Sequence, residues 1–147
     1  MKKIISIICI IFFSTSSFSQ EEKNILGYWL NEEKDAKIQI FEEKNILVGK
    51  IVWLKEPKDE FNKWKLDKEN PNEKLRNRKI LGLQIINNLN WDSNKREWRG
   101  GEIYDAREGD TYSLYAKIKE NGDLSLRGYI GFSLFGKTTT WTKTKLY

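Results

Sequence analysis

The stretch from Trp98 to Asp105 reads WRGGEIYD, and it is followed by RGYIG at residues 127–131 and TWT at residues 140–142. These segments combine aromatic or β-branched residues with glycine, a composition typical of strands that bend. Between residue 96 and Tyr147 such short segments follow one another almost without interruption. This half of the chain therefore predicts an all-β domain.

The first half continues the pattern. Gly27–Leu30 is a short apolar segment, Ala36–Phe41 alternates apolar and polar residues, and Ile46–Leu54 is rich in β-branched residues after a turn at residues 43–45. Alternation with period two predicts strands with one buried face. Further strands are expected at residues 80–86, 97–104, 111–119, 124–131 and 137–145, with a turn region at 87–95. Asn121-Gly122 predicts a tight two-residue turn, because both residues tolerate positive φ.

About eight strands, mostly joined to their neighbours in sequence, favour an antiparallel up-and-down β-barrel, because closure removes exposed sheet edges. A β-sandwich is the alternative. Residues 55–79 interrupt the pattern with both prolines of the chain and many charges, which predicts one long loop. A loop of this length in a compact domain is often functional.

The first residues predict export. Lys2 and Lys3 precede an apolar run at residues 4–13 and a small-residue stretch that ends at Ser19, which is the pattern of a signal peptide. The run is too short to span a membrane. We expect cleavage after Ser19, which leaves residues 20–147 as a single domain in the periplasm or outside the cell. The one cysteine, Cys9, would be removed with the signal.

The charge balance argues against a nucleic-acid partner. The net charge of +5 falls to +3 when Lys2 and Lys3 are removed, and the remaining basic residues are interleaved with acids. Neutralising nucleic-acid phosphates requires a basic stripe, which this sequence lacks.

Two blocks in the long loop, DKENP at residues 67–71 and LRNR at 75–78, complete a resemblance. With the aromatic segments they resemble a bacterial family known as domain of unknown function 2147, from Gly27 to Lys143. The resemblance implies a lipocalin-like barrel, similar to the calycins, with no established activity. In that broader group an early tryptophan packs at the barrel base against a basic residue of the last strand. Here Trp29 would pack against Lys143, or alternatively Arg127.

Several chemistries are excluded by composition. The sequence has no histidine, which removes Ser-His-Asp and Cys-His catalysis and imidazole metal sites. We assign no catalytic residue, metal or cofactor. A hydrolase that uses a pair among Asp67, Glu102 and Asp105 is the enzymatic alternative. The simpler interpretation of Asp105 is that it caps a turn running to Gly109.

The candidate ligand-binding residues come from the long loop and from two strands. They are Asp67, Asn70, Arg76, Arg78, Tyr104, Asp105 and Arg127. Arginine forks bind carboxylate or phosphate groups, so these residues could hold an anionic group at a barrel mouth. The structural alternative is that one arginine pairs with Asp67 or Asp105 and pins the loop.

The aromatic residues permit two interpretations of the barrel interior, since they could line a cavity or fill it. The apolar link Phe132–Gly136 is expected to plug one end of the barrel, whereas its exposure would indicate a partner surface. Three functions follow. The first is a non-enzymatic carrier of a small, partly apolar ligand. The second is a module that binds an envelope protein or glycan through the long loop, and the third is the carboxylate hydrolase.

Overall fold

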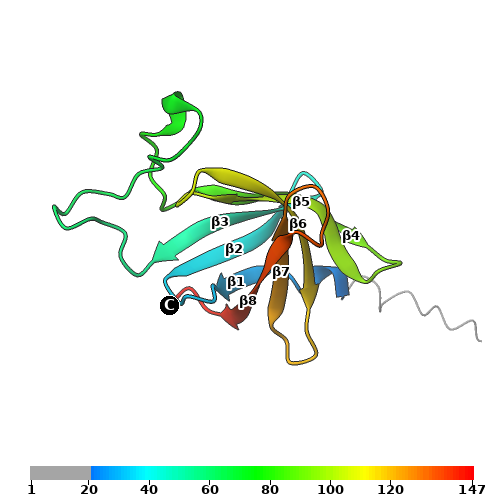
Figure 1. Ribbon diagram of the computed structural model, residues 1–147. Helices are drawn as coiled ribbons and strands as arrows, with labels where there is room; N and C mark the ends of the chain where they lie inside the picture. The colour runs from blue at the N-terminus through cyan, green and yellow to red at the C-terminus, as the bar shows by residue number, and fades with distance from the viewer. Residues whose placement is uncertain (1–20) are drawn as a thin grey trace, which may run out of the picture.

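The computed structural model describes residues 21–147, so the predicted signal peptide and Cys9 lie outside the described residues. The chain forms a closed antiparallel barrel in which each strand pairs with its neighbours in sequence and β8 pairs with β1 (Figure 1). The strands are β1 (Gly27–Leu30), β2 (Ala36–Glu43), β3 (Ile46–Leu54), β4 (Gln84–Asp92), β5 (Glu97–Asp105), β6 (Asp110–Ile118), β7 (Leu124–Tyr129) and β8 (Gly136–Thr144). The predicted up-and-down barrel is confirmed.

Antiparallel alternation divides the connections between the two ends of the barrel. The loop end carries the connections 31–35, 55–83, 106–109 and 130–135. The helix end carries a helical turn at residues 21–23 and the connections 44–45, 93–96 and 119–123. The long β3–β4 connection, which contains the 3-10 helix η1 (Glu73–Leu75), projects well beyond the strands in Figure 1.

The barrel interior is filled by side chains. Trp29, Trp98 and Trp141 are at most 4% exposed and pack with buried isoleucine and leucine residues. Two glycines show how tight the packing is. A Cβ atom on Gly101 would lie 2.4 Å from Cδ1 of Leu89, and one on Gly49 would lie 3.1 Å from the side chain of Ile86. A methyl group would collide with Leu89 at Gly101, and at Gly49 it would fit only if Ile86 shifted.

Two local predictions are wrong. The fourth strand runs over residues 84–92 rather than 80–86, because pairing with β5 and burial of Leu89 outweigh the turn preference of the surrounding asparagines. The tight two-residue turn is Lys44-Asn45, with φ of 52° and 64°. The connection at residues 119–123 is longer, and there Gly122 has a positive φ of 87° while Asn121 does not.

Candidate functional site

Four of the candidate residues form one cluster around Asp67, which is fully buried. Oδ2 of Asp67 accepts hydrogen bonds from Nε of Arg78 at 2.8 Å and from Nδ2 of Asn70 at 2.9 Å. Oδ1 accepts from the Tyr104 hydroxyl at 2.5 Å, and Asn70 also donates to that hydroxyl oxygen at 3.0 Å. Arg76 joins at the edge, donating from Nε to the Asn70 carbonyl at 2.8 Å.

The Asp67 cluster lies on the outer wall of the barrel. Ile103 pairs with Ile86, which is fully buried in the interior, so the next residue, Tyr104, faces outward. The backbone of Glu69 packs against the β5–β6 connection so closely that a Cβ on Gly109 would lie 1.9 Å from the Glu69 carbonyl oxygen. The long loop is therefore docked onto the β5–β6 hairpin, outside the barrel.

The cluster matches the structural alternative considered for the loop arginines, in which one of them pairs with Asp67 and pins the loop. Burial, and then the hydrogen bond to Asp67, raise the pKa of Tyr104, so its hydroxyl stays a donor through neutral pH. Arg78 also lies over the Tyr104 ring, 5.8 Å from its centroid. That these residues bind a ligand stays a prediction.

Asp105 is separate from this cluster and caps a turn, as the simpler interpretation held. Its carboxylate accepts from the backbone and the guanidinium of Arg107, and its carbonyl accepts from Gly109 N–H at 2.8 Å. Burial alone would raise the pKa of Asp105, but the hydrogen bonds from Arg107 outweigh it and lower that pKa. Because strand residues alternate, Glu102 and Asp105 lie on opposite faces of β5. The two carboxyls do not share a cleft.

Arg127 lies on β7 and contacts the β7–β8 connection. It donates to the carbonyls of Ser133 and Leu134 and to the Thr138 hydroxyl. The expectation that this connection plugs the barrel is wrong: Phe132, Leu134 and Phe135 are 77%, 85% and 73% exposed. The interior is already filled by the core tryptophans and leaves no place for these side chains.

The pairing at the barrel base is confirmed for Lys143 and is wrong for Arg127. Nζ of Lys143 lies 4.3 Å from the centroid of a Trp29 ring and donates to the carbonyls of Asn24 and Leu26. The Trp29 indole donates to the Ile25 carbonyl at 2.8 Å. Burial lowers the pKa of Lys143. This arrangement ties the segment before β1 to the last strand.

The loop end is bridged by an ion pair between two of its connections. Arg107 of the β5–β6 connection lies 4.0 Å from Glu33 of the β1–β2 connection, and these hairpins are on opposite sides of the barrel. Both side chains are partly exposed, so the pair contributes little energy. The packed core fills the barrel, and this ion pair crosses its loop end. The centre of the barrel is therefore not a suitable ligand site.

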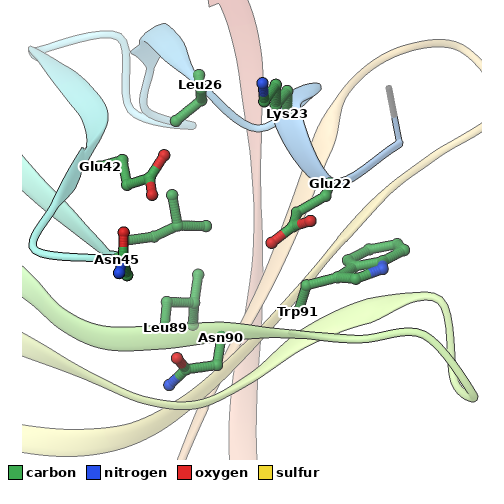
Figure 2. Close-up of a pocket in the computed structure, with 9 residues that line it drawn as sticks. Glu22, Lys23, Leu26, Glu42, Asn45, Leu89, Asn90 and Trp91 are labelled. Atoms are coloured by element: carbon green, nitrogen blue, oxygen red, sulfur yellow. The ribbon is translucent and has the colours of Figure 1, made fainter. Parts of the chain in front are cut away.

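Two hollows flank the helical turn at the helix end instead. The first has a volume of about 250 Å³ and lies between the turn and the β2–β3 and β4–β5 hairpins (Figure 2). Glu22 and Glu42 point into it from opposite sides, and Leu89 and Trp91 line it (Figure 2). It is smaller than the usual range of small-molecule sites.

The second hollow is a groove of about 650 Å³, within the usual range. Trp91 and Ile118 provide its apolar surface, and the Trp91 ring lies on the buried Trp98 ring, with 4.7 Å between the ring centroids. Four basic residues also line it: Lys95, Arg96, Lys117 and Lys119. Sequence reasoning missed this groove, because its residues come from four separate segments and form no motif.

The Trp98 indole gives the groove an unusual feature. Its Nε1 is buried and makes no hydrogen bond to any of residues 21–147. Buried donors normally have partners, so an orphaned one needs an explanation. Because this atom is sealed from solvent, a molecule in the groove would reach it only if the surrounding side chains moved.

Residues 21–147 contain no group of three acidic, cysteine or histidine residues placed to hold a metal ion. Among these residues no helix has the length and apolar character needed to cross a membrane.

The closed barrel, with its buried Trp29 under Lys143, is of the lipocalin-like class. Protein HP1028 from the human pathogen Helicobacter pylori, described as belonging to the lipocalin family, has a similar structure, with a TM-score of 0.70 and 28% sequence identity. The similarity covers 82% of this chain and 83% of that one. Residues 27–143 match the family described as "Uncharacterized protein conserved in bacteria (DUF2147)", so the chain belongs to this family. No curated protein matches the chain.

Proposed function

We propose that the mature protein is an exported, non-enzymatic binding protein that takes a small amphipathic anion in the groove beside Trp98. The observation that carries this proposal is a groove of small-molecule size in which an indole ring and four basic side chains lie together. The lipocalin-like fold supports a small-molecule ligand. An apolar body would lie on Trp91 and Ile118, and a carboxylate or phosphate would meet the lysines.

The charge around the groove favours an anion. Arg96 is paired with Glu21, whereas Lys95 and Lys117 have no carboxylate within salt-bridge distance among the described residues. Lys119 donates to the Thr140 hydroxyl at 2.8 Å and keeps its charge uncompensated. Glu120 also lines the groove, but the basic residues outnumber the acidic ones.

Export is proposed from the sequence of the first nineteen residues. Cleavage after Ser19 would leave only Gln20 ahead of Glu21, which lines the groove. Intact mass measurement of the protein recovered from cells should therefore give a chain that starts at Gln20. A chain that retains its first nineteen residues in the cytoplasm would contradict this part of the proposal.

The binding test uses the mature protein, purified without detergent. Native mass spectrometry first looks for a retained small molecule. Titration with dodecanoate, followed by tryptophan fluorescence, should then show binding about tenfold or more tighter than for uncharged dodecanol, a difference of about 1.4 kcal/mol. Equal affinities for the two probes would contradict an anion site, and no binding of either would contradict the groove.

Charge reversal locates the site. Lys117→Glu should weaken dodecanoate binding at least about tenfold, because an attractive charge becomes a repulsive one. Lys74→Glu makes the same change at an exposed position in η1 and should leave binding unchanged. Equal effects of both variants would indicate that only net charge matters.

A second candidate function is recognition of an envelope protein or glycan by the long loop. Phe61 is 73% and Trp64 39% exposed, and the ammonium groups of Lys58 and Lys79 lie 5.2 Å and 4.4 Å from the centroid of a Trp64 ring. A held aromatic ring of this kind suits stacking on a sugar or a peptide. Co-sedimentation with peptidoglycan that Phe61→Ser and Trp64→Ser abolish would support it, and its absence together with failed crosslinking in cells would count against it.

A further inference from the structure

The β7–β8 connection at residues 130–135 exposes a concentrated group of large apolar side chains. Ile130, Phe132, Leu134 and Phe135 are between 66% and 85% exposed. Contiguous exposed apolar surface of this kind marks a binding surface for a protein or a membrane. The surroundings of the loop distinguish between these partners.

Four consecutive carbonyls of the loop accept hydrogen bonds within the protein. The carbonyls of Phe132 and Phe135 accept from the N–H groups of Phe135 and Ile130. The two carbonyls between them, of Ser133 and Leu134, accept from the Arg127 guanidinium at 2.8 Å and 3.1 Å. All four consecutive carbonyls at residues 132–135 are thus satisfied within the protein. Satisfied carbonyls lower the cost of moving the loop tip out of water.

The residues just below the tip suit a bilayer interface. Tyr129 directly precedes the loop, and its ring lies 6.1 Å from that of Tyr115 on the outer face of the barrel. Tyrosine is enriched at the level of lipid headgroups. Arg127 has no carboxylate partner among the described residues, and the exposed Lys137 follows the loop on β8. Two acidic residues lie near this part of β8: Glu32, which accepts a hydrogen bond from Thr139, and Asp105, whose pKa the charge of Lys137 helps to lower.

We propose that the mature protein docks peripherally on an anionic lipid bilayer by inserting the tip of its β7–β8 connection. Phe132, Leu134 and Phe135 enter the hydrocarbon, and Arg127 and Lys137 meet lipid phosphates. The docking surface lies at the loop end, opposite the proposed ligand groove. Docking does not depend on that ligand. It adds to the proposed function a location, the surface of a membrane.

The test is flotation of the mature protein with two kinds of vesicle, one of phosphatidylglycerol with phosphatidylethanolamine and one of phosphatidylcholine. We expect partitioning into the anionic vesicles that weakens as salt rises, because exposed charges are screened. The double variant Phe132→Ser with Leu134→Ser should lose about 100-fold in partitioning, since each large apolar side chain contributes at least about a factor of ten. Both positions are exposed, so circular dichroism should show an unchanged fold.

The matched control is Phe61→Ser, which removes an aromatic residue of similar exposure from the β3–β4 connection and should leave partitioning unchanged. Failure of the wild-type protein to float with either vesicle would overturn the proposal, as would equal flotation of the double variant. Sedimentation velocity tests whether a second copy of the protein binds this loop instead. A dimer that the double variant dissociates would show that a second copy, not lipid, covers the loop.

Discussion

Arg78 donates from Nε to Oδ2 of Asp67 at 2.8 Å, and this bond joins a half-exposed cation to a carboxylate with no solvent exposure. The two residues are eleven positions apart in the long loop. On the outer wall of the barrel, the Tyr104 hydroxyl donates a further hydrogen bond to Asp67. A buried carboxylate is tolerated only when it is paired and hydrogen-bonded. The loop conformation therefore depends on keeping every donor to Asp67.

Removing the cation tests this dependence. Arg78→Met should lower the free energy of unfolding by about 2 kcal/mol, because a buried charge loses a partner but keeps the donors Tyr104 and Asn70. Arg76→Met is the control, since Arg76 contacts a carbonyl and an exposed glutamate, and it should cost less than about 1 kcal/mol. Urea denaturation measures both. Equal losses would show that Asp67 does not depend on Arg78.

The Tyr104 hydroxyl gives a prediction with a pH dependence. Tyr104→Phe removes a donor to Asp67 and should cost about 1 to 2 kcal/mol at neutral pH. The pKa of Tyr104 is raised in the folded protein, so the folded state disfavours the ionised form. The stability that the Tyr104 hydroxyl contributes to the folded protein is fully present below pH 10.0, the ordinary pKa of a tyrosine. It is lost as the pH rises above that value and through the raised pKa of Tyr104.

Urea denaturation at a series of pH values between 8 and 12 would measure this effect. The wild-type protein should lose stability more steeply above pH 10 than Tyr104→Phe does. The Tyr112→Phe variant provides a comparison. In the wild-type protein, the hydrogen bond from the Tyr112 hydroxyl to Glu108 raises the pKa of Tyr112 to about 12. Parallel curves for the wild type and Tyr104→Phe would contradict the role of the Tyr104 hydroxyl.

A pair of glycine variants tests the packed interior. Gly101→Ala would bring Cβ to 2.4 Å from Leu89 and should cost about 1 to 3 kcal/mol through overpacking. Gly128→Ala also lies in a strand, but its Cβ would make ordinary contacts, with 3.5 Å to the nearest atom. It should change stability by less than about 1 kcal/mol. Thermal unfolding that ranks the two equally would indicate an interior with free space.

A second pair tests the docking of the long loop. Gly109 and Gly122 both have positive φ, at 77° and 87°, so alanine is strained at either position by about 1 kcal/mol. At Gly109 the new Cβ would also collide with the Glu69 carbonyl, whereas at Gly122 it would meet open space. Gly109→Ala should therefore cost about 2 kcal/mol more and speed proteolysis within residues 55–79. Equal protease sensitivity would mean that the loop is not held there.

Much of the fold was predictable because side-chain alternation is a local property. Period two and β-branched residues located most strands, and sequential pairing predicted the barrel. The error at β4 arose where asparagines suggested a turn but Leu89 is buried between two neighbouring strands. Local preference lost to tertiary pairing there, as strand preferences often do.

The candidate residues were predictable as chemical types but not as one site. Asp67, Asn70, Arg78 and Tyr104 do meet, although on the outer wall of the barrel rather than at a mouth. Asp105 and Arg127 each hold a different connection. The groove beside Trp98 was not visible in the sequence, because no single segment contributes more than a few of its residues.

The sequence by itself determined the all-β class, the sequential strand order and the absence of histidine chemistry, since all three depend on composition or on neighbouring residues. Only the tertiary structure decided that the interior is packed, that Phe132 and Leu134 face water, and that Asp67 meets Tyr104. The physical reason is distance along the chain. The contact between Asp67 and Tyr104 joins residues 37 positions apart. Which side chains share the limited interior depends on barrel closure, in which β1 pairs with β8.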